Sequence, residues 1–170
     1  GHKVKMSEVH GMSQRGGSVI SYVRYGKEIF SPVVEKGSAD FLLGFELLET
    51  ARYIDYLRDG GTIICNNQRI APMSVITGAQ KYPESIISDL GKLPLSLHVV
   101  DALNIAREAG NIKTVNSVIL GCFARLSSIE YPIWETALKN SVPSRFLEVN
   151  LKAFQSGYNA LENNAPAERN

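Results

Sequence analysis

The order of apolar runs and helical repeats in the middle of the chain restricts the possible folds more than any other feature. Residues 40–45 form a short apolar run of the kind that is buried on both faces of a parallel sheet. Residues 46–57 then place apolar side chains at helical spacing. Gly60 and Gly61 are expected to end this helix, since glycine readily adopts the left-handed conformation. Residues 62–65 begin another strand, so the sequence predicts a strand–helix–strand unit.

The alternation of strand and helix continues beyond this unit. Pro83 suits the first turn of a short helix that starts at residue 82, and residues 95–100 return to a strand. Asp101 is a suitable N-cap for a helix whose apolar residues recur at helical spacing until Gly110. This pattern predicts an α/β fold with a doubly wound, mostly parallel sheet that is covered by helices.

The last third of the chain is expected to be helical. Its apolar residues form three stripes, at Ile119, Cys122, Phe123 and Leu126, at Ile133, Trp134, Ala137 and Leu138, and at Leu147, Leu151, Phe154, Tyr158 and Leu161. Such stripes are typical of core or partner-facing surfaces. Because no repeat or linker divides the chain, residues 1–162 are expected to form one domain, followed by a polar tail at residues 163–170.

Composition excludes several classes of protein. With 18 basic and 17 acidic residues mixed along 170 positions, the chain has no basic face for nucleic acid. No apolar run approaches the roughly 20 residues needed to cross a bilayer, and no signal-peptide pattern is present, so a cytoplasmic protein is expected. Cys65 and Cys122 lie in separate apolar segments and are expected in the core. Two thiols cannot form a four-thiolate iron–sulfur or zinc centre, so any such centre is expected on a partner.

Residues 7–19 concentrate the side chains that are best suited to binding or chemistry. If residues 8–10 are extended, Glu8 and His10 lie on one face of a strand, where the carboxylate could orient the imidazole. Arg15 can bind a carboxylate or phosphate through its planar fork, while adjacent glycines let backbone N–H groups approach closely. The candidate contacts are Glu8, His10, Gly11, Gln14, Arg15, Gly16 and Gly17.

The same residues also have a purely structural interpretation. Gly16 and Gly17 suit a simple turn, Arg15 suits a surface ion pair, and an isolated histidine is often structural. No residue is assigned as catalytic and none as a metal ligand. Downstream, residues 18–25 and 28–31 are rich in strand-forming side chains and are expected to form a β-hairpin or two adjacent strands.

The order of these motifs closely resembles the gamma-type domain of the 2-oxoacid:ferredoxin oxidoreductases, and in particular the small beta subunit of the indolepyruvate enzymes. The resemblance begins with residues 8–19 and extends over most of the chain. Further matches follow in the same order at Arg24, Ser31-Pro32, Ala39-Asp40, Gly44-Phe45-Glu46, Gly60-Gly61-Thr62, Asp101-Ala102, Ile105-Ala106, Ala109-Gly110-Asn111, Asn116, Leu120-Gly121, residues 150–154 and Gly157.

This resemblance implies a small, cofactor-free subunit that is not active alone. The larger partner subunit would carry thiamine diphosphate and iron–sulfur clusters, decarboxylate indolepyruvate or another 2-oxoacid, and pass electrons to ferredoxin, while coenzyme A takes the acyl group. Gln14, Arg15, Gly16 and Gly17 would then lie near the partner's active site, with Glu8 and His10 in support. There Arg15 could hold a phosphate of coenzyme A or a carboxylate.

The resemblance also implies a missing part. Members of this family usually begin with a strand, a glycine-rich loop and a helix ahead of the segment that corresponds to residues 3–5. This sequence opens directly at Gly1, so the doubly wound sheet is expected to lack that unit, which normally supplies its central strand.

Two other functions stay open at this point. The chain could be a purely structural subunit of a pyruvate, 2-ketoisovalerate or 2-oxoglutarate oxidoreductase complex and touch no ligand. It could also be an independent nucleotide-binding enzyme, although it contains neither a G-x-G-x-x-G nor a P-loop pattern.

Overall fold

The core of the molecule is a parallel sheet. The structure, a computed structural model, describes residues 1–10 and 19–161. The sheet has three strands in the order β3 (Ala39–Gly44), β4 (Leu57–Asn66) and β5 (Ser96–Val100). Ile63, Ile64 and Cys65 of the central strand β4 are 0% exposed. A strand with both faces buried is the expected consequence of an apolar run between two helical layers.

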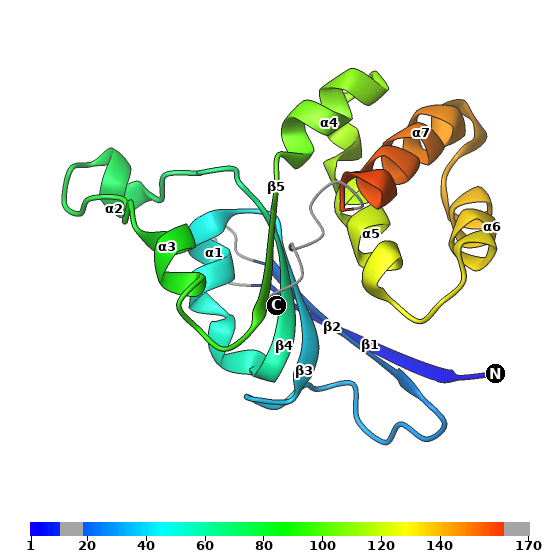
Figure 1. Cartoon of the computed structure of the whole chain (residues 1–170), viewed down its shortest axis with the longest axis horizontal. Coiled ribbons are helices and arrows are strands. Elements are labelled where there is room, and N and C mark those ends of the chain that lie inside the picture. Colours follow the sequence, from blue (N-terminus) through cyan, green and yellow to red (C-terminus); the bar gives the residue numbers. More distant parts are fainter. Residues whose placement is uncertain (11–18, 162–170) are drawn as a thin grey trace, which may run out of the picture.

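Helices cover both faces of this sheet (Figure 1). One face carries α1 (Leu47–Arg52) and α3 (Ile86–Leu90), and the other carries α4 (Ala102–Ala109), α5 (Val115–Leu126) and α7 (Ser144–Ala160). Because side chains alternate along a strand, Ile63 and Cys65 pack in the α1 and α3 cluster, whereas Ile64 packs with the other helices. The predicted helix-covered α/β sheet is confirmed. In the described ranges, none of the helices combines the length and apolar character needed to cross a bilayer.

The helix after β5 follows the predicted boundaries. Asp101 is the N-cap of α4, and its Oδ1 accepts a hydrogen bond from the backbone N–H of Asn104 at 3.1 Å. Gly110 ends the helix with a φ of 118°, a conformation that glycine adopts without strain. A short 3-10 helix, η3 (Ile112–Thr114), then leads into α5. The capping residues Asp101 and Gly110 therefore predict both ends of α4 correctly.

Two of the C-terminal helices, α5 and α7, pack with their backbones in contact. The predicted stripes lie in α5, α6 (Tyr131–Ser141) and α7, except for Leu161, which follows directly after α7, so the helical last third is confirmed. Gly121 of α5 and Gly157 of α7 face the opposite helix. A Cβ added to Gly121 would lie 2.1 Å from the carbonyl oxygen of Phe154, and one added to Gly157 would lie 2.0 Å from that of Val118. The two backbones therefore touch directly.

The helix expected over residues 46–57 is shorter than predicted. α1 ends at Arg52, a 3-10 helix, η2 (Ile54–Tyr56), follows, and β4 already begins at Leu57. The prediction that Gly60 and Gly61 stop a helix is therefore wrong, because both lie inside a strand.

The two glycines lie instead at a β-bulge, where the pairing register between β3 and β4 shifts. Pairing with β3 jumps from Ala39–Leu57 to Phe41–Thr62, so β4 holds several extra residues at this point. Gly60 has a φ of 67°, and a Cβ on Gly61 would lie 2.6 Å from Cγ of Leu57. Glycine is therefore required by the bulge and not by a helix end. A pair of glycines is typical of a helix end and also of a β-bulge, so the sequence alone did not distinguish the two.

Two further boundaries differ from the prediction. The helix expected from residue 82 begins only at Ile86, as α3. A short helix that was not predicted, α2 (Met73–Ile76), lies in the preceding segment. Both differences concern short elements without a strong apolar repeat, where local spacing carries little information.

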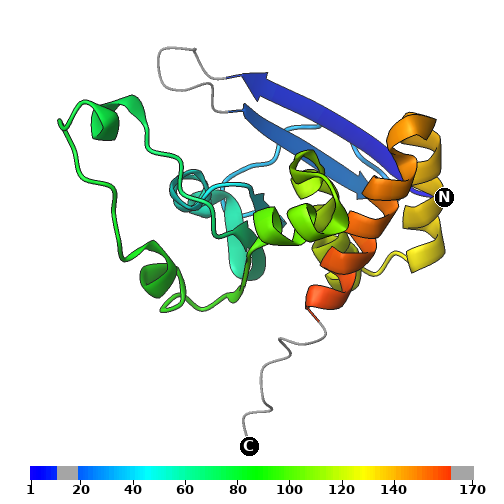
Figure 2. The ribbon, with the colours of Figure 1, turned by 90° about the horizontal axis from the view of Figure 1, so that it is seen from above.

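A separate antiparallel ribbon lies beside the main sheet (Figure 2). It consists of β1 (Lys3–His10) and β2 (Val19–Gly26), paired from Lys3–Gly26 to His10–Val19. The predicted pairing of residues 18–25 with residues 28–31 is wrong, since residues 28–31 form no strand. The strand that pairs with β2 is β1, which precedes it in sequence. The strand-forming side chains of residues 28–31 favoured a downstream partner instead.

The imidazole of His98 in β5 gives a testable pH dependence. Its Nε2 lies 3.0 Å from Oγ of Ser96, and burial lowers the pKa of His98. A histidine with a lowered pKa binds protons less readily when folded than when unfolded, so it supports full stability above its ordinary pKa of about 6.5 and loses it below. We expect the free energy of urea unfolding to fall between pH 7.5 and pH 5, and His98→Gln to reduce that slope. An unchanged slope in the variant would contradict this assignment.

Candidate functional site

The ribbon places Glu8 and His10 on one face, as the sequence predicts. His10 Nε2 lies 3.5 Å from Oε2 of Glu8, and Ser21 Oγ donates to Oε1 of Glu8 at 3.4 Å from the neighbouring strand. Both side chains are accessible to solvent, with exposed fractions of 46% for Glu8 and 69% for His10. A carboxylate in this position can fix the orientation of the imidazole while both groups stay accessible to another molecule.

The other candidate residues lie outside the described part of the chain. Gly11, Gln14, Arg15, Gly16 and Gly17 are in this group, and their roles stay predictions. The structure does fix where this segment leaves and re-enters the ribbon, because His10 and Val19 are paired across it. Both anchor points therefore lie at the end of the ribbon that carries the Glu8–His10 pair.

Basic side chains of the ribbon are engaged on its other face. Lys5 Nζ donates to the carbonyl oxygen of Phe30 at 2.9 Å. Arg24 donates to the carbonyl oxygens of Ser31 and Val33 at 3.3 and 3.1 Å. These contacts hold segment 30–33 against the ribbon. Lys5 and Arg24 therefore do not pair with Glu8, whose polar partners among the described residues are Ser21 and His10.

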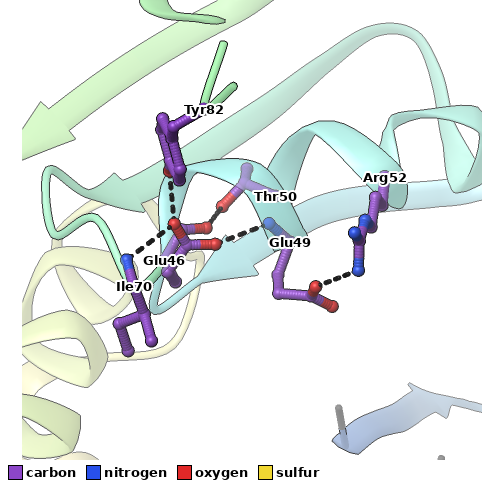
Figure 3. A network of polar contacts seen from close by, with 6 residues as sticks. All are labelled: Glu46, Glu49, Thr50, Arg52, Ile70 and Tyr82. Atoms are coloured by element: carbon purple, nitrogen blue, oxygen red, sulfur yellow. Dashed lines mark hydrogen bonds and ion pairs between the residues drawn. The ribbon is translucent and has the colours of Figure 1, made fainter. Parts of the chain in front are cut away.

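A second polar cluster was not predicted from the sequence, and it lies where β3 ends (Figure 3). Glu46 is only 6% exposed. Its carboxylate accepts hydrogen bonds from the backbone N–H of Glu49 at 2.8 Å, from that of Ile70 at 3.2 Å, and from the hydroxyl of Tyr82. Burial and the Glu46 hydrogen bond raise the pKa of Tyr82. The carboxylate thus joins the start of α1 to the loop that follows β4.

Asn66 performs a similar task at the end of β4. It is fully buried, its Nδ2 donates to the carbonyl oxygen of Phe45 and to Oε1 of Gln68, each at 3.2 Å, and its Oδ1 accepts from the N–H of Ala102 at 3.1 Å. One amide therefore ties together the carboxyl ends of β3 and β4 and the start of α4. Ligands of open α/β sheets bind outside this edge, but Glu46 and Asn66 are satisfied by the chain itself. Their role is to hold the edge together.

These side chains were missed because their partners are distant in sequence. Glu46 reaches Ile70 and Tyr82, which are 24 and 36 residues away. The one local signal is an acid between a strand and a helix, directly before the first helical residue, which is the position of an N-cap. That signal indicates a cap and says nothing about the loop that the same carboxylate holds.

The two cysteines lie in the core, as predicted. Cys65 and Cys122 are both 0% exposed. Burial raises the pKa of the Cys65 thiol and raises that of Cys122 to about 12, so both stay protonated at neutral pH. Across the described ranges, His, Cys, Asp and Glu form no group of three or more that could hold a metal ion.

Comparison with known proteins gives a consistent result. A family model described as pyruvate ferredoxin/flavodoxin oxidoreductase matches residues 1–160. The indolepyruvate oxidoreductase subunit IorB of Thermococcus kodakarensis is 39% identical over 95% of this chain and 83% of its own length.

Solved structures share the fold. The gamma subunit of a keto/oxoacid ferredoxin oxidoreductase from Geobacter sulfurreducens superposes with a TM-score of 0.67 and 22% identity, over 95% of this chain and 82% of that one. A 2-oxoglutarate:ferredoxin oxidoreductase from Magnetococcus marinus, solved with 2-oxoglutarate, coenzyme A and succinyl-CoA, gives a TM-score of 0.64 and 17% identity. The match covers 96% of this chain but 27% of that one, so there the same fold is one part of a longer polypeptide.

Proposed function

Because this chain belongs to the pyruvate ferredoxin/flavodoxin oxidoreductase family, we propose that it is the small subunit of an indolepyruvate:ferredoxin oxidoreductase. The observation that carries the proposal is the identity to the archaeal IorB subunit over nearly the whole chain. In the proposed reaction an aryl 2-oxoacid, coenzyme A and two oxidised ferredoxins give an acyl-CoA, carbon dioxide, a proton and two reduced ferredoxins. The chain takes part as a subunit and is not active alone.

The division of labour in this proposal places the cofactors on a larger subunit. Thiamine diphosphate and iron–sulfur clusters there would supply decarboxylation and electron transfer. The small subunit would contribute its exposed Glu8–His10 pair and the adjoining candidate residues Gly11, Gln14, Arg15, Gly16 and Gly17 to the edge of that active site. Arg15 would bind a phosphate of coenzyme A or a carboxylate, with Glu8 and His10 in support.

The first experiment is anaerobic turnover of the reconstituted complex. The full-length small subunit is added to its large partner with coenzyme A and a ferredoxin or viologen acceptor. We expect reduction of the acceptor to require this chain and to be faster with indolepyruvate than with pyruvate or 2-oxoglutarate. If the large subunit is equally active alone, the proposed function is wrong. If another 2-oxoacid is preferred, the subunit role stands and the aromatic substrate class does not.

A substitution at Arg15 distinguishes a ligand contact from a structural role. Loss of a charge-assisted hydrogen bond to coenzyme A in Arg15→Ala should lower kcat/KM for coenzyme A on the order of tenfold, with assembly intact. Arg15→Lys should recover only part of this loss, because it keeps the charge without the planar fork. Arg52→Ala, which removes an exposed ion pair with Glu49, serves as the matched control. If Arg15→Ala instead prevents assembly, the purely structural subunit is the better description.

A further inference from the structure

The β1–β2 ribbon needs an attachment to the rest of the molecule. The described strands form two separate sheets, so strand pairing among them does not join the ribbon to β3, β4 or β5. After β2 the chain continues through a connecting segment, residues 27–38, to β3 (Figure 2). A two-stranded ribbon is marginally stable in water by itself. Side-chain contacts with the body of the molecule, defined here as residues 39–161, therefore decide where the ribbon lies.

One face of the ribbon is partly covered. In strand β2, Ile20 and Tyr22 are half-buried, whereas Val19, Ser21 and Val23 are exposed. Because successive side chains of a strand point to opposite faces, this alternation shows that one face of β2 meets another part of the molecule. This face is called the inner face here. Tyr22 is the largest of its half-buried side chains.

Tyr22 contacts the body of the molecule. Its ring centroid lies 5.7 Å from that of Tyr56, with an angle of 44° between the ring planes. A hydrogen bond with Tyr56, together with burial, raises the pKa of Tyr22 to about 12. Tyr56 ends the 3-10 helix η2, directly before the central strand β4. The contact therefore joins the ribbon to the start of the central strand of the main sheet.

The first part of the connecting segment is bound to the ribbon. Lys5 and Arg24 donate hydrogen bonds to carbonyl oxygens within residues 30–33. These residues closely follow β2, so they move together with the ribbon. The contacts of Lys5 and Arg24 therefore stiffen the ribbon, but they do not by themselves determine its position on the body.

The last part of the connecting segment is bound to the body. The backbone N–H of Gly37 donates to the carbonyl oxygen of Asp55 at 2.8 Å, and that of Ser38 donates to the carbonyl oxygen of Tyr56 at 3.1 Å. Both acceptors belong to η2. The chain thus passes from the ribbon to the body between residues 33 and 37, and rotation within this stretch would move the ribbon. The contact between the two tyrosine rings opposes that rotation, because it joins the two parts outside the connecting segment.

The residues next to Tyr22 hold the candidate site on the opposite face. Ser21 directly precedes Tyr22 and donates to Oε1 of Glu8 at 3.4 Å. Across the ribbon, Tyr22 pairs with Ser7, which directly precedes Glu8. The other carboxylate oxygen of Glu8 lies 3.5 Å from Nε2 of His10. A change in the position of the ribbon at Tyr22 would therefore move Glu8 and His10 with it.

We infer that Tyr22 is a positioning residue of the candidate site. Its contact with Tyr56 holds the ribbon at one place on the body, and it thereby sets where Glu8 and His10 meet the active site of the large subunit. Tyr22 touches no substrate and acts through the Glu8–His10 pair. The catalytic half of this inference rests on the proposed function, whereas the position of the ribbon is a property of this chain.

Pulsed electron paramagnetic resonance measures the position of the ribbon. Nitroxide labels are attached at Val23→Cys on the ribbon and at Gln155→Cys on α7, where both native side chains are exposed. Cys65 and Cys122 are buried and stay protonated at neutral pH, so they react slowly with the label. The labelled chain with both native tyrosines should give one narrow distance distribution.

Removal of either ring should release the ribbon. Tyr22→Ala and Tyr56→Ala should each make the distance distribution about twice as broad, because the ribbon can then turn about the connecting segment. The double variant should be no broader than either single variant, since both substitutions remove the same contact. Tyr25→Ala is the matched control and should leave the distribution unchanged. Tyr25 lies on the opposite face of β2, is 41% exposed, and has its ring contact with His2 beside β1. Circular dichroism establishes that each variant is folded.

Turnover of the reconstituted complex tests the catalytic half of the inference. Tyr22→Ala should lower kcat/KM for coenzyme A on the order of tenfold, because displaced active-site groups no longer align with the reactants. If Tyr22 acts through the Glu8–His10 pair, the same substitution should cost less than about twofold in a His10→Ala background. A purely structural residue would give the same loss in both backgrounds. Tyr25→Ala is again the control.

The outcomes distinguish this inference from the proposed function. If the distance distribution stays narrow in Tyr22→Ala and Tyr56→Ala, the tyrosine contact does not hold the ribbon and the inference is wrong. Unchanged turnover in Tyr22→Ala, or equal losses with and without His10, overturns the positioning role while the proposed function stands. If the native complex shows no turnover, the proposed function fails together with the catalytic half, and the distance measurement still decides whether Tyr22 holds the ribbon.

Discussion

Replacing Gly157 by alanine is expected to lower the stability of the chain by about 3 kcal/mol or more. The new Cβ would lie 2.0 Å from the carbonyl oxygen and 2.8 Å from the carbonyl carbon of Val118. These are backbone atoms of α5, so no side-chain rotation relieves the overlap. α5 and α7 would have to separate, and the cluster that holds Cys122 and Ala153 would lose its packing. For a chain of this length the melting temperature should fall by about 6–12 °C.

The measurement is thermal unfolding of the small subunit followed by circular dichroism. Gly121→Ala should give a similar loss, since its Cβ would lie 2.1 Å from the carbonyl oxygen of Phe154 in the reverse direction. Gly26→Ala is the matched control, because its Cβ would meet only Cδ1 of Ile29 at 3.4 Å. A melting temperature within a degree or two of wild type for both helix variants would show that α5 and α7 are not in backbone contact.

Replacing Glu46 by leucine is expected to cost about 3 kcal/mol and to release the loop that follows β4. The backbone N–H groups of Glu49 and Ile70 and the hydroxyl of Tyr82 would all lose their acceptor in a buried position. Glu46→Gln should give a smaller loss. One amide oxygen can still accept from Ile70 and Tyr82, but the NH2 group then faces the N–H of Glu49, which is also a donor.

Hydrogen exchange at the amide of Ile70 and chemical unfolding together test this role of Glu46. Exchange at Ile70 should become much faster in Glu46→Leu, because the amide loses its only described acceptor. Glu84→Gln is the matched control. Glu84 is 76% exposed and pairs with Arg69, so its replacement should change stability by less than about 1 kcal/mol. Unchanged protection at Ile70 in Glu46→Leu would contradict the network.

Much of the fold could be predicted because its signals are local. The N-cap at Asp101 and the glycine at Gly110 define α4 within one segment, and the apolar repeat of α5 needs no information from elsewhere. The register of β4 could not be predicted in this way. Gly60 and Gly61 have the same local preferences at a helix end and in a bulge, and only pairing with β3 decides between them.

The candidate site could likewise be predicted only in part from the sequence. Side-chain alternation alone predicts that Glu8 and His10 share a face, and the ribbon confirms it. Which strand pairs with β1 was not predicted, so Ser21, the cross-strand partner of Glu8, was also missed. That Val23 and Tyr25 lie on the same face as Val4, Met6 and Glu8 likewise follows only from the pairing. Spacing in one strand shows which residues share a face, but not which of its two faces is covered.

The contacts of Lys5 and Arg24 have a consequence for how the surface can change during evolution. Both side chains bind carbonyl oxygens of segment 30–33, and every amino acid supplies a carbonyl. Substitution of Phe30 or Val33, which are 86% and 52% exposed, therefore leaves the path of the segment intact. Selection that preserves the path of this backbone acts on Lys5 and Arg24, while the side chains of segment 30–33 are free to vary. Related chains can thus present different surfaces to different neighbours on one unchanged scaffold.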